Sequence, residues 1–277
     1  MIRAGLVLLL AVGACSSATP AAGPPDLADH RGRFVVSCAP SHTGFDDPLL
    51  LPGRAGASHL HEFFGNVAID EGDRDRRVAA ASVAGADTTC ETAADRASYW
   101  VPALLDEDGA RIAPDAIDAY YRAGRGVEPT DVVAYPSGLG VVAGGGPDRD
   151  PPPTSVVGWS CSANPRRSAA PPDCEGELRL RVTFPDCWDG SDLHGDDHRG
   201  HMAYSGVEGC PAAHPVAVPQ LELVVRYPAS GGEELSLSSG PIDTAHADFW
   251  NLWEPAALER EVRACLHGDV VCGNAAG

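Results

Sequence analysis

The chain contains no lysine, so all 20 of its basic residues are arginines. Against them stand 39 Asp and Glu residues, which give a formal net charge of −19 at pH 7. Nucleic acids and anionic membrane surfaces are bound through clustered positive charge. We therefore expect no nucleic-acid partner, and the excess of carboxylates is explained by the solubility of an exported protein.

Several signatures of cofactor binding and catalysis are also missing. The Gly144–Pro147 stretch lacks the Lys-Ser/Thr pair of a phosphate loop, and no dinucleotide fingerprint or nucleophile elbow is present. No CxxC pair occurs, which argues against a zinc site built from cysteines. The apolar run Leu6–Val12 is too short to cross a bilayer as a helix.

That short run belongs to a predicted signal peptide, residues 1–14, in which Arg3 is the positive residue. The run ends in Val-Gly-Ala-Cys15, which resembles the bacterial lipobox, whose cysteine becomes the lipidated first residue of the mature protein. Residues 15–32 are rich in Ser, Ala, Pro and Gly and are expected to form a disordered tether. The sequence thus predicts a lipoprotein anchored through Cys15 to the outer face of the bacterial cytoplasmic membrane, with ordinary secretion as the alternative.

The cysteine content agrees with export. Nine cysteines are present, and an even set of eight remains without Cys15, as a disulfide framework requires. Spacing alone leaves many pairings open, but short loops favour four bridges: Cys161–Cys174, Cys187–Cys210, Cys265–Cys272 and, by what remains, Cys38–Cys90.

Strand signals dominate the rest of the chain. Arg33–Cys38 is a short β-rich run, and Leu178–Phe184 and Leu221–Tyr227 alternate apolar and polar residues with the period of a half-buried strand. Leu235 and Leu237 are expected on a return strand beside Leu221–Tyr227.

Two further signals complete the expected fold. Asp106–Gly109 separates two apolar runs and predicts a hairpin. One segment has helical periodicity, beginning at Pro255 and carrying Leu258, Val262 and Leu266. We therefore expect residues 33–277 to form a single extracellular domain, mainly β, built as an antiparallel sandwich or a jelly-roll-like fold with a short C-terminal helix and disulfides.

The strongest chemical signal is the stretch Ser58-His59-Leu60-His61-Glu62. In an extended segment residues i and i+2 point to the same side, so His59 and His61 would present two imidazoles together. Two later segments, 197–204 and 244–250, are similarly rich in His, Asp and aromatic residues. Our central hypothesis is that the three segments meet in one pocket.

Such a pocket has a metal interpretation, because zinc and copper accept neutral imidazole and a catalytic zinc often has three protein ligands. His59 and His61 would supply two ligands. His198, His201 or His246 would supply a third, and Asp248 or Asp197 an oxygen ligand. The alternative is that some of these histidines only orient loops through hydrogen bonds.

The same residues have an acid–base interpretation. Glycan cleavage needs a proton donor and a base or nucleophile. The residues suited to this task by type are His59, His61, Glu62, His198, Arg199, His201 and Tyr204. The carboxylates considered for a hydrolytic pair are Glu62, Asp186, Asp189 and Asp197, which are also common turn residues. The net negative charge argues against a lyase that acts on polyanions. Four tryptophans could stack on sugar rings, but packing in the core would explain their presence equally well. They are Trp159, Trp188, Trp250 and Trp253.

Seven ordered stretches resemble a family of domains of unknown function, the one numbered nineteen ninety-six, found in secreted fungal and actinobacterial proteins. They are SHLHEFFGN (58–66), TTCETAADRASYWVPAL (88–104), VVGWSC (156–161), FPDCWDG (184–190), DHRGHMAY (197–204), CPAAHPVAVPQLELVVRY (210–227) and TAHADFWNLW (244–253). The likeness spans residues 35–268 and implies one extracellular domain without implying a reaction. Motif membership, together with the chemistry above, makes these residues the site candidates: His59, His61, Asp197, His198, His201, His214, His246 and Asp248.

Three hypotheses follow. The first is an envelope enzyme, a hydrolase or lyase that acts on a polysaccharide. The second is a non-catalytic protein that binds a divalent metal or a wall glycan. The third is a disulfide-bonded structural protein of the envelope. The histidine motifs with tryptophans nearby slightly favour the first hypothesis.

Overall fold

The computed structural model describes residues 1, 31–70, 76–146, 149–162, 164–232 and 234–273, with only the backbone described for 76–79. The predicted signal peptide, Cys15 and almost all of the predicted tether lie outside the described residues. Within the described part of the chain, no helix combines the length and apolar character needed to cross a membrane.

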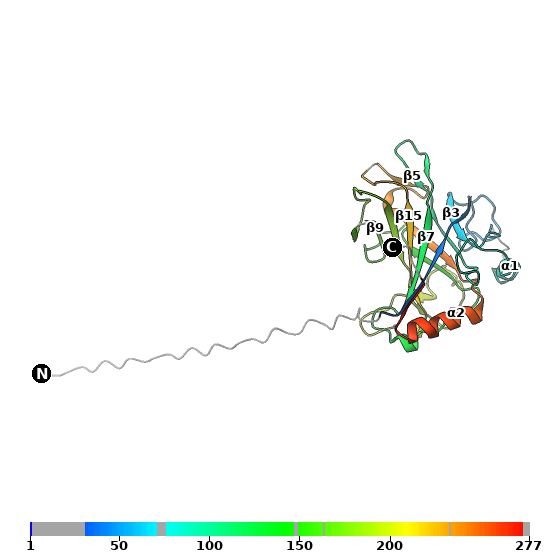
Figure 1. The fold of residues 1–277 in the computed structure, drawn as a ribbon, viewed down its shortest axis with the longest axis vertical. Coiled ribbons are helices and arrows are strands. Elements are labelled where there is room, and N and C mark those ends of the chain that lie inside the picture. The colour runs from blue at the N-terminus through cyan, green and yellow to red at the C-terminus, as the bar shows by residue number, and fades with distance from the viewer. Residues whose placement is uncertain (2–30, 71–75, 147–148, 163, 233, 274–277) are drawn as a thin grey trace.

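The larger of two main sheets has seven strands in the order β10-β9-β11-β15-β7-β1-β18. Figure 1 labels three of them, β7, β9 and β15. Neighbouring strands are antiparallel, except that β18 runs parallel to β1. The strands are β1 (Arg33–Cys38), β7 (Ala116–Arg122), β9 (Val157–Cys161), β10 (Asn164–Ser168), β11 (Leu178–Thr183), β15 (Gln220–Tyr227) and β18 (Val271–Cys272). The three strands predicted from β-rich composition or alternation, β1, β11 and β15, are confirmed.

The second main sheet has five antiparallel strands in the order β2-β3-β4-β17-β8. They are β2 (Pro40–Gly44), β3 (His61–Gly65), β4 (Ser98–Pro102), β8 (Gly140–Gly144) and β17 (His246–Trp250). Two of the three histidine segments therefore belong to the same sheet, through β3 and β17.

Two small sheets extend the main ones. One consists of β5 (Leu104–Leu105), β6 (Arg111–Ile112) and β16 (Ser236–Leu237), and the other of β12 (Cys187–Trp188), β13 (Met202–Ala203) and β14 (Val216–Ala217). The hairpin predicted around Asp106–Gly109 is confirmed as β5 and β6. The return strand expected beside β15 is wrong in its partner: β16 pairs with β5, because β11 and β7 already occupy both edges of β15.

Helices contribute little to the fold. The predicted C-terminal helix is confirmed as α2 (Pro255–Glu261), which continues into a π-helical segment, η3 (Val262–His267). Two short 3₁₀ turns are η1 (Pro129–Asp131) and η2 (Ile242–Thr244). The helix α1 (Arg76–Val83) was not predicted from the sequence.

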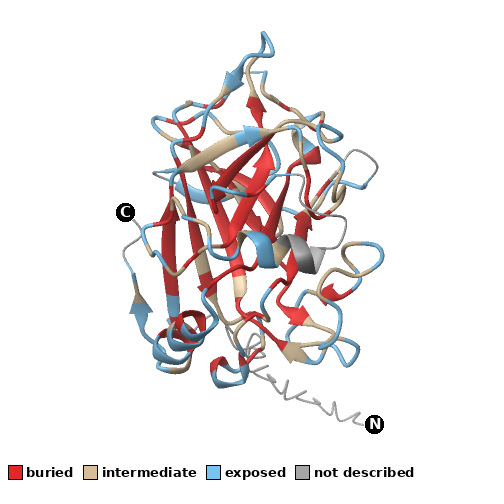
Figure 2. Cartoon of the chain, turned by 90° about the vertical axis from the view of Figure 1, so that its right-hand side faces the viewer, coloured by how far each residue is buried: buried red, intermediate tan, exposed pale blue. Residues whose placement is uncertain are grey.

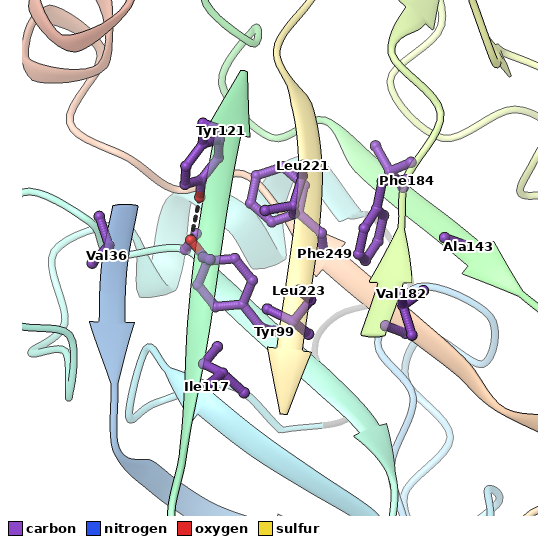
Figure 3. Close-up of a cluster of buried hydrophobic side chains, with 14 of the residues drawn as sticks. Val36, Tyr99, Ile117, Tyr121, Ala143, Val182, Phe184, Leu221, Leu223 and Phe249 are labelled. Carbon is purple, nitrogen blue, oxygen red and sulfur yellow. Dashed lines mark hydrogen bonds between the residues drawn. The ribbon is translucent and has the colours of Figure 1, made fainter. Parts of the chain in front are cut away.

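The two main sheets pack face to face, as expected for a β-sandwich. Figure 3 shows Tyr99 and Phe249 of the five-stranded sheet facing Ile117, Leu221 and Leu223 of the seven-stranded sheet. All five side chains are fully buried. Burial of each large apolar side chain is worth roughly 1.5–3 kcal/mol, so this interface is the main source of stability. The mainly β, antiparallel fold predicted from the sequence is thereby confirmed.

The two sheets differ on their outer faces. Strand β11 alternates buried and partly exposed residues, whereas every residue of β3, β4 and β17 is buried. A second, smaller core covers the outer face of the five-stranded sheet, and Figure 2 shows α1 crossing in front of its strands. The members of this core are Leu49, Phe63, Ile69, Trp100, Val142, Trp250 and Leu252, with Ala80 and Val83 of α1 packed against them. Polar side chains on this face are therefore buried as well.

All four disulfides predicted from loop length are confirmed. Cys38 is bonded to Cys90, Cys161 to Cys174, Cys187 to Cys210, and Cys265 to Cys272. Core packing rather than sugar stacking accounts for three of the four tryptophans considered above, since Trp159, Trp250 and Trp253 are buried. Trp188 is partly exposed.

Candidate metal centre

His59 and His61 lie together at the start of β3. His59 lies two residues before His61, which is the first residue of the strand. Their rings are 4.2 Å apart between centroids, as the i, i+2 spacing predicted. His61 is fully buried, and its Nδ1–H donates a hydrogen bond of 2.9 Å to the carbonyl of Asp46. Its Nε2 atom is left pointing away from that carbonyl, as in a histidine prepared to ligate a metal.

The third histidine of the group comes from β17. Strand β4 lies between β3 and β17, and its terminal Pro102 is opposite His61. The register of β17 on β4 places His246 on the other side of Pro102. Because proline is compact, the two imidazoles can approach above it, and the His246 ring lies 5.8 Å from that of His61 and 5.1 Å from that of His59.

His246 has the same second contact as His61. Its Nδ1–H donates a hydrogen bond of 2.8 Å to the carbonyl of Thr244. A backbone acceptor on Nδ1 fixes the tautomer that leaves Nε2 with a free lone pair. His59, His61 and His246 each offer one nitrogen, and these nitrogens lie within 4.8 Å of one another.

Two carboxylates adjoin the histidines. Asp248 follows His246 by two residues on β17 and so points to the same face. Asp47, from the loop before β3, completes a second group in which ligand atoms of Asp47, His61 and Asp248 lie within 4.8 Å of one another. Asp47 and Asp248 are buried. The sequence analysis missed Asp47, which lies in a segment whose Pro and Gly content indicates only a loop.

This cluster concentrates buried ligand atoms that have no hydrogen-bond partner on a few neighbouring residues. Nε2 of His59, Nε2 of His61 and both carboxylate oxygens of Asp248 are buried and accept or donate no hydrogen bond. Buried polar atoms are nearly always paired, because leaving one unpaired costs about 1–3 kcal/mol. Four such atoms on neighbouring residues are the expected mark of a missing central partner.

The electrostatics of the cluster follow from this burial. Burial holds the pKa of His61 well below its usual value, and His59 and His246 lower it further. Burial also lowers the pKa of His59 and brings the pKa of His246 down to about 4. The three imidazoles are therefore neutral at pH 7, the form that binds a metal.

Asp248 is shifted in the opposite direction. Burial, reinforced by the nearby Asp47 carboxylate, raises the pKa of Asp248 well above its usual value, while Arg199 opposes that rise. Burial therefore favours the protonated form of this carboxyl group. A divalent ion bound beside His61, the residue that the two groups share, would instead favour the charged carboxylate.

The segment 197–204 joins the site in only one respect. Arg199 interacts electrostatically with Asp248, and its guanidinium donates hydrogen bonds to the carbonyls of Val142, Gly144 and Gly145 on and after β8. Among the described residues, neither of the two ligand groups above includes a histidine of this segment.

The remaining residues of that segment have local contacts. His201 is buried, and its Nε2–H donates a 2.8 Å hydrogen bond to the carbonyl of Gly140. His198 has a positive φ of 62° and lies near Leu49 and Val142. Asp197 accepts backbone N–H groups within its own turn, which identifies it as a turn residue. His214 donates from Nε2 to the carbonyl of Gly200.

The carboxylates considered for an acid–base pair are dispersed. Glu62 is buried on the opposite face of β3 from His61 and forms a bidentate ion pair with Arg111. Asp186 is buried and bonds the backbone N–H of Ser205, whereas Asp189 accepts hydrogen bonds within its own exposed turn. The structure therefore does not bring Glu62 to the histidines.

A pocket of about 330 Å³ lies beside the cluster. Val142 and Gly144, which pair with Asp248 and His246 across β8 and β17, form part of its wall. Its other lining residues include Arg149, Arg199 and Tyr204. Two predicted catalytic residues, Arg199 and Tyr204, thus share a pocket, although Tyr204 already donates its hydroxyl hydrogen to the carbonyl of Thr183.

Fold and site together define a disulfide-bonded β-sandwich with a buried histidine–carboxylate cluster. A family model described as "Domain of unknown function (DUF1996)" matches residues 47–253, and the chain belongs to this family. The match includes all five residues of the cluster. Comparisons with curated proteins and with solved structures found no match.

Proposed function

We propose that this chain binds one divalent metal ion, zinc foremost, through His59, His61 and His246. The observation that carries the proposal is the convergence of buried ligand atoms that have no hydrogen-bond partner, namely those of His59, His61 and Asp248. The geometry of the ring nitrogens supports it, since backbone carbonyls hold Nδ1 of His61 and His246 and leave Nε2 for the ion.

The donor types favour zinc over harder ions. Calcium and magnesium select oxygen ligands, whereas zinc and copper(II) accept imidazole nitrogen together with carboxylate oxygen. Three histidines leave one position of a tetrahedral zinc, and Asp248 is the protein group available for it. A zinc ion closed by Asp248 would have a structural role, while a water in that position would give an ion able to polarise a substrate.

Metal analysis tests this proposal directly. Protein purified without chelator should contain close to one zinc or copper ion per chain by mass spectrometry. His61→Ala should lose the ion, while His214→Ala, in a histidine outside the cluster, should retain it. Wild-type protein that carries no metal and is not stabilised by added zinc or copper would overturn the proposal.

A polysaccharide-directed hydrolase or lyase is the second candidate function. The pocket beside the cluster favours it, because Arg199 lines that pocket and interacts with Asp248. Incubation with wall polysaccharides should then yield new reducing ends or unsaturated products. These products should vanish in the variant that carries both His59→Ala and His61→Ala, and their persistence would exclude this site.

The cellular setting of this function is an envelope lipoprotein anchored through Cys15, as the sequence predicts. The four disulfides support export, because such bonds persist in oxidising compartments. Expression in a bacterial host with labelled palmitate should label the wild type and not Cys15→Ser. A wild-type chain recovered unlabelled from the medium would instead indicate ordinary secretion.

A further inference from the structure

The outer face of the seven-stranded sheet carries a concentration of arginines that the metal site does not use. Leu178, Leu180 and Val182 of β11 point into the core, so the residues between them point outward. The same alternation on the neighbouring strands places six arginines on this outer face: Arg33 of β1, Arg122 of β7, Arg167 of β10, Arg179 and Arg181 of β11, and Arg226 of β15. We call these residues the arginine face.

The registers bring these arginines together. Arg226 is directly opposite Arg179, and Arg122 is directly opposite Arg33. Arg167 reaches over from β10 at the sheet edge, and its guanidinium lies 2.8 Å from Glu222 of β15. Arg122, Arg167 and Arg181 converge on Glu222, and Arg179 and Arg226 form a cross-strand pair farther along the same face.

The carboxylates of this face do not balance the arginines. Glu222 forms ion pairs with Arg122, Arg167 and Arg181. Asp118 pairs with Arg226, and Glu177, beside β11, pairs with Arg179. Arg33 forms no ion pair among the described residues. Six arginines on this face thus have only three carboxylates as ion-pair partners, on a chain whose net charge is −19.

The arginine side chains remain partly exposed. The side chain of Arg122 is 42% exposed, and those of Arg179, Arg181 and Arg226 are about one fifth exposed. Each guanidinium has five N–H donors, more than its carboxylate partner here can accept. The donors left over are fixed in direction by the ion pairs, so an incoming anion would meet a preorganised array.

One aromatic side chain lies in the middle of the array. Tyr120 of β7 points outward between Val35 of β1 and Glu222 of β15 and is partly exposed. A tyrosine ring on a sheet surface offers a flat apolar platform for the face of a sugar ring, with a hydroxyl group at its end. Arginine is the side chain best shaped for bidentate bonds to carboxylates.

From this arrangement we propose that the arginine face binds an acidic polysaccharide, with a pyranose ring on Tyr120 and the carboxylates of uronic-acid units on the surrounding guanidinium groups. The net charge of the chain does not prevent this, because charges more than about 8 Å apart are largely screened at physiological ionic strength. The proposal does not depend on the metal centre, which lies on the outer face of the other sheet.

Titration of an oligosaccharide of galacturonic acid into the protein, followed by calorimetry, tests the proposal. Binding should be saturable and should weaken as salt rises above physiological strength. The carboxyl-reduced, neutral form of the same oligosaccharide should bind at least about tenfold more weakly. Inorganic polyphosphate of matched charge should also bind more weakly, since it has no sugar ring to place on Tyr120.

Variants identify the surface. Arg122→Gln should weaken binding about tenfold, because it removes a charged donor while two arginines remain beside Glu222. Tyr120→Ala should weaken binding about fivefold, and Tyr120→Phe should stay within about twofold of wild type because the ring remains. Arg54→Gln, an exposed arginine in the loop that covers the other sheet, is the matched control and should bind as wild type.

Several results would overturn the proposal. They are no binding of the acidic oligosaccharide, equal affinity for its neutral form or for polyphosphate, and unchanged affinity in both Arg122→Gln and Tyr120→Ala. Metal content is measured on the same samples. Protein that contains no metal but binds the oligosaccharide would support this proposal and contradict the metal proposal. Protein that contains metal but does not bind the oligosaccharide would support only the metal proposal.

Discussion

Replacing Asp248 by asparagine tests whether Asp248 is a metal ligand or a carboxylate with a purely structural role. Burial and the neighbouring Asp47 raise the pKa of Asp248 well above its usual value, and neither of its oxygens has a hydrogen-bond partner. An amide of the same shape carries no charge and removes the repulsion from Asp47. The metal-free variant should therefore be as stable as the metal-free wild type or more stable, contrary to the usual effect of a buried substitution.

The stabilisation that added zinc gives should, by contrast, be smaller in Asp248→Asn than in the wild type. An ion present at 100 times its dissociation constant stabilises the folded state by about 2.7 kcal/mol. For a domain of this size that corresponds to a rise in melting temperature of about 5–11 °C. If loss of the Asp248 ligand weakens affinity 100-fold, the same zinc concentration contributes only about 0.4 kcal/mol, a rise of about 1–2 °C.

Calorimetry of chelator-treated protein, with and without added zinc, measures both effects on each variant. Asp196→Asn, in an exposed turn, is the matched control and should behave as wild type in both conditions. The reasoning fails if the metal-free Asp248→Asn protein is destabilised while its zinc-induced shift remains that of the wild type. That combination would assign Asp248 to packing and would leave the three histidines as the complete ligand set.

Two other predictions concern stability away from the metal centre. Burial raises the pKa of Asp95 to about 7. Between about pH 4 and pH 7 the folded state therefore holds a proton that the unfolded state releases. The free energy of unfolding should fall by about 4 kcal/mol as the pH rises through this range. The Asp95→Asn variant should lack this pH dependence. Denaturant unfolding at several pH values should therefore show a difference in unfolding free energy between wild type and variant that changes across the range. A difference that stays constant with pH would contradict the prediction. Replacing Cys38 and Cys90 together by alanine should cost about 4 kcal/mol, against about 2 kcal/mol for the pair Cys265 and Cys272, because the first bridge closes a loop of 52 residues and the second a loop of 7. Guanidinium unfolding measures both losses, and equal losses would show that loop entropy does not decide them.

The fold could be predicted best where one face of a strand meets the core and the other meets charged groups. Strand β11 alternates leucine with arginine because its outer face belongs to the arginine face. Strands β4 and β17 are buried on both faces, so their sequences show no clean alternation. The run Tyr99–Leu105 was expected only as one arm of the hairpin, and His246–Trp250 was not predicted as a strand. The covering helix α1 is short and has a weak pattern, and its role depends on which sheet it lies against.

The site could be predicted only within single segments. The spacing of His59 and His61 indicated a shared face because side-chain direction repeats every two residues in a strand. That this pair meets His246 and Asp248 depends on β4 lying between β3 and β17, which the sequence does not encode locally. Asp47 reaches the cluster from a loop, and His201, which the motif pattern favoured as a ligand, bonds Gly140 instead.

The positions of the metal centre and the arginine face constrain any joint function. Side chains that point outward from the two sheets lie on opposite sides of a sandwich whose sheets are about 10 Å apart. An ion at His59, His61 and His246 therefore cannot contact a sugar bound on Tyr120. If both proposals hold, the arginine face retains the protein on an acidic polysaccharide. Any cleavage then takes place in the pocket beside the metal, on a different segment of the polysaccharide from the one bound to the arginine face. Chelation should then abolish cleavage and leave binding to the acidic oligosaccharide unchanged, whereas loss of both together would mean that the polymer binds at the metal.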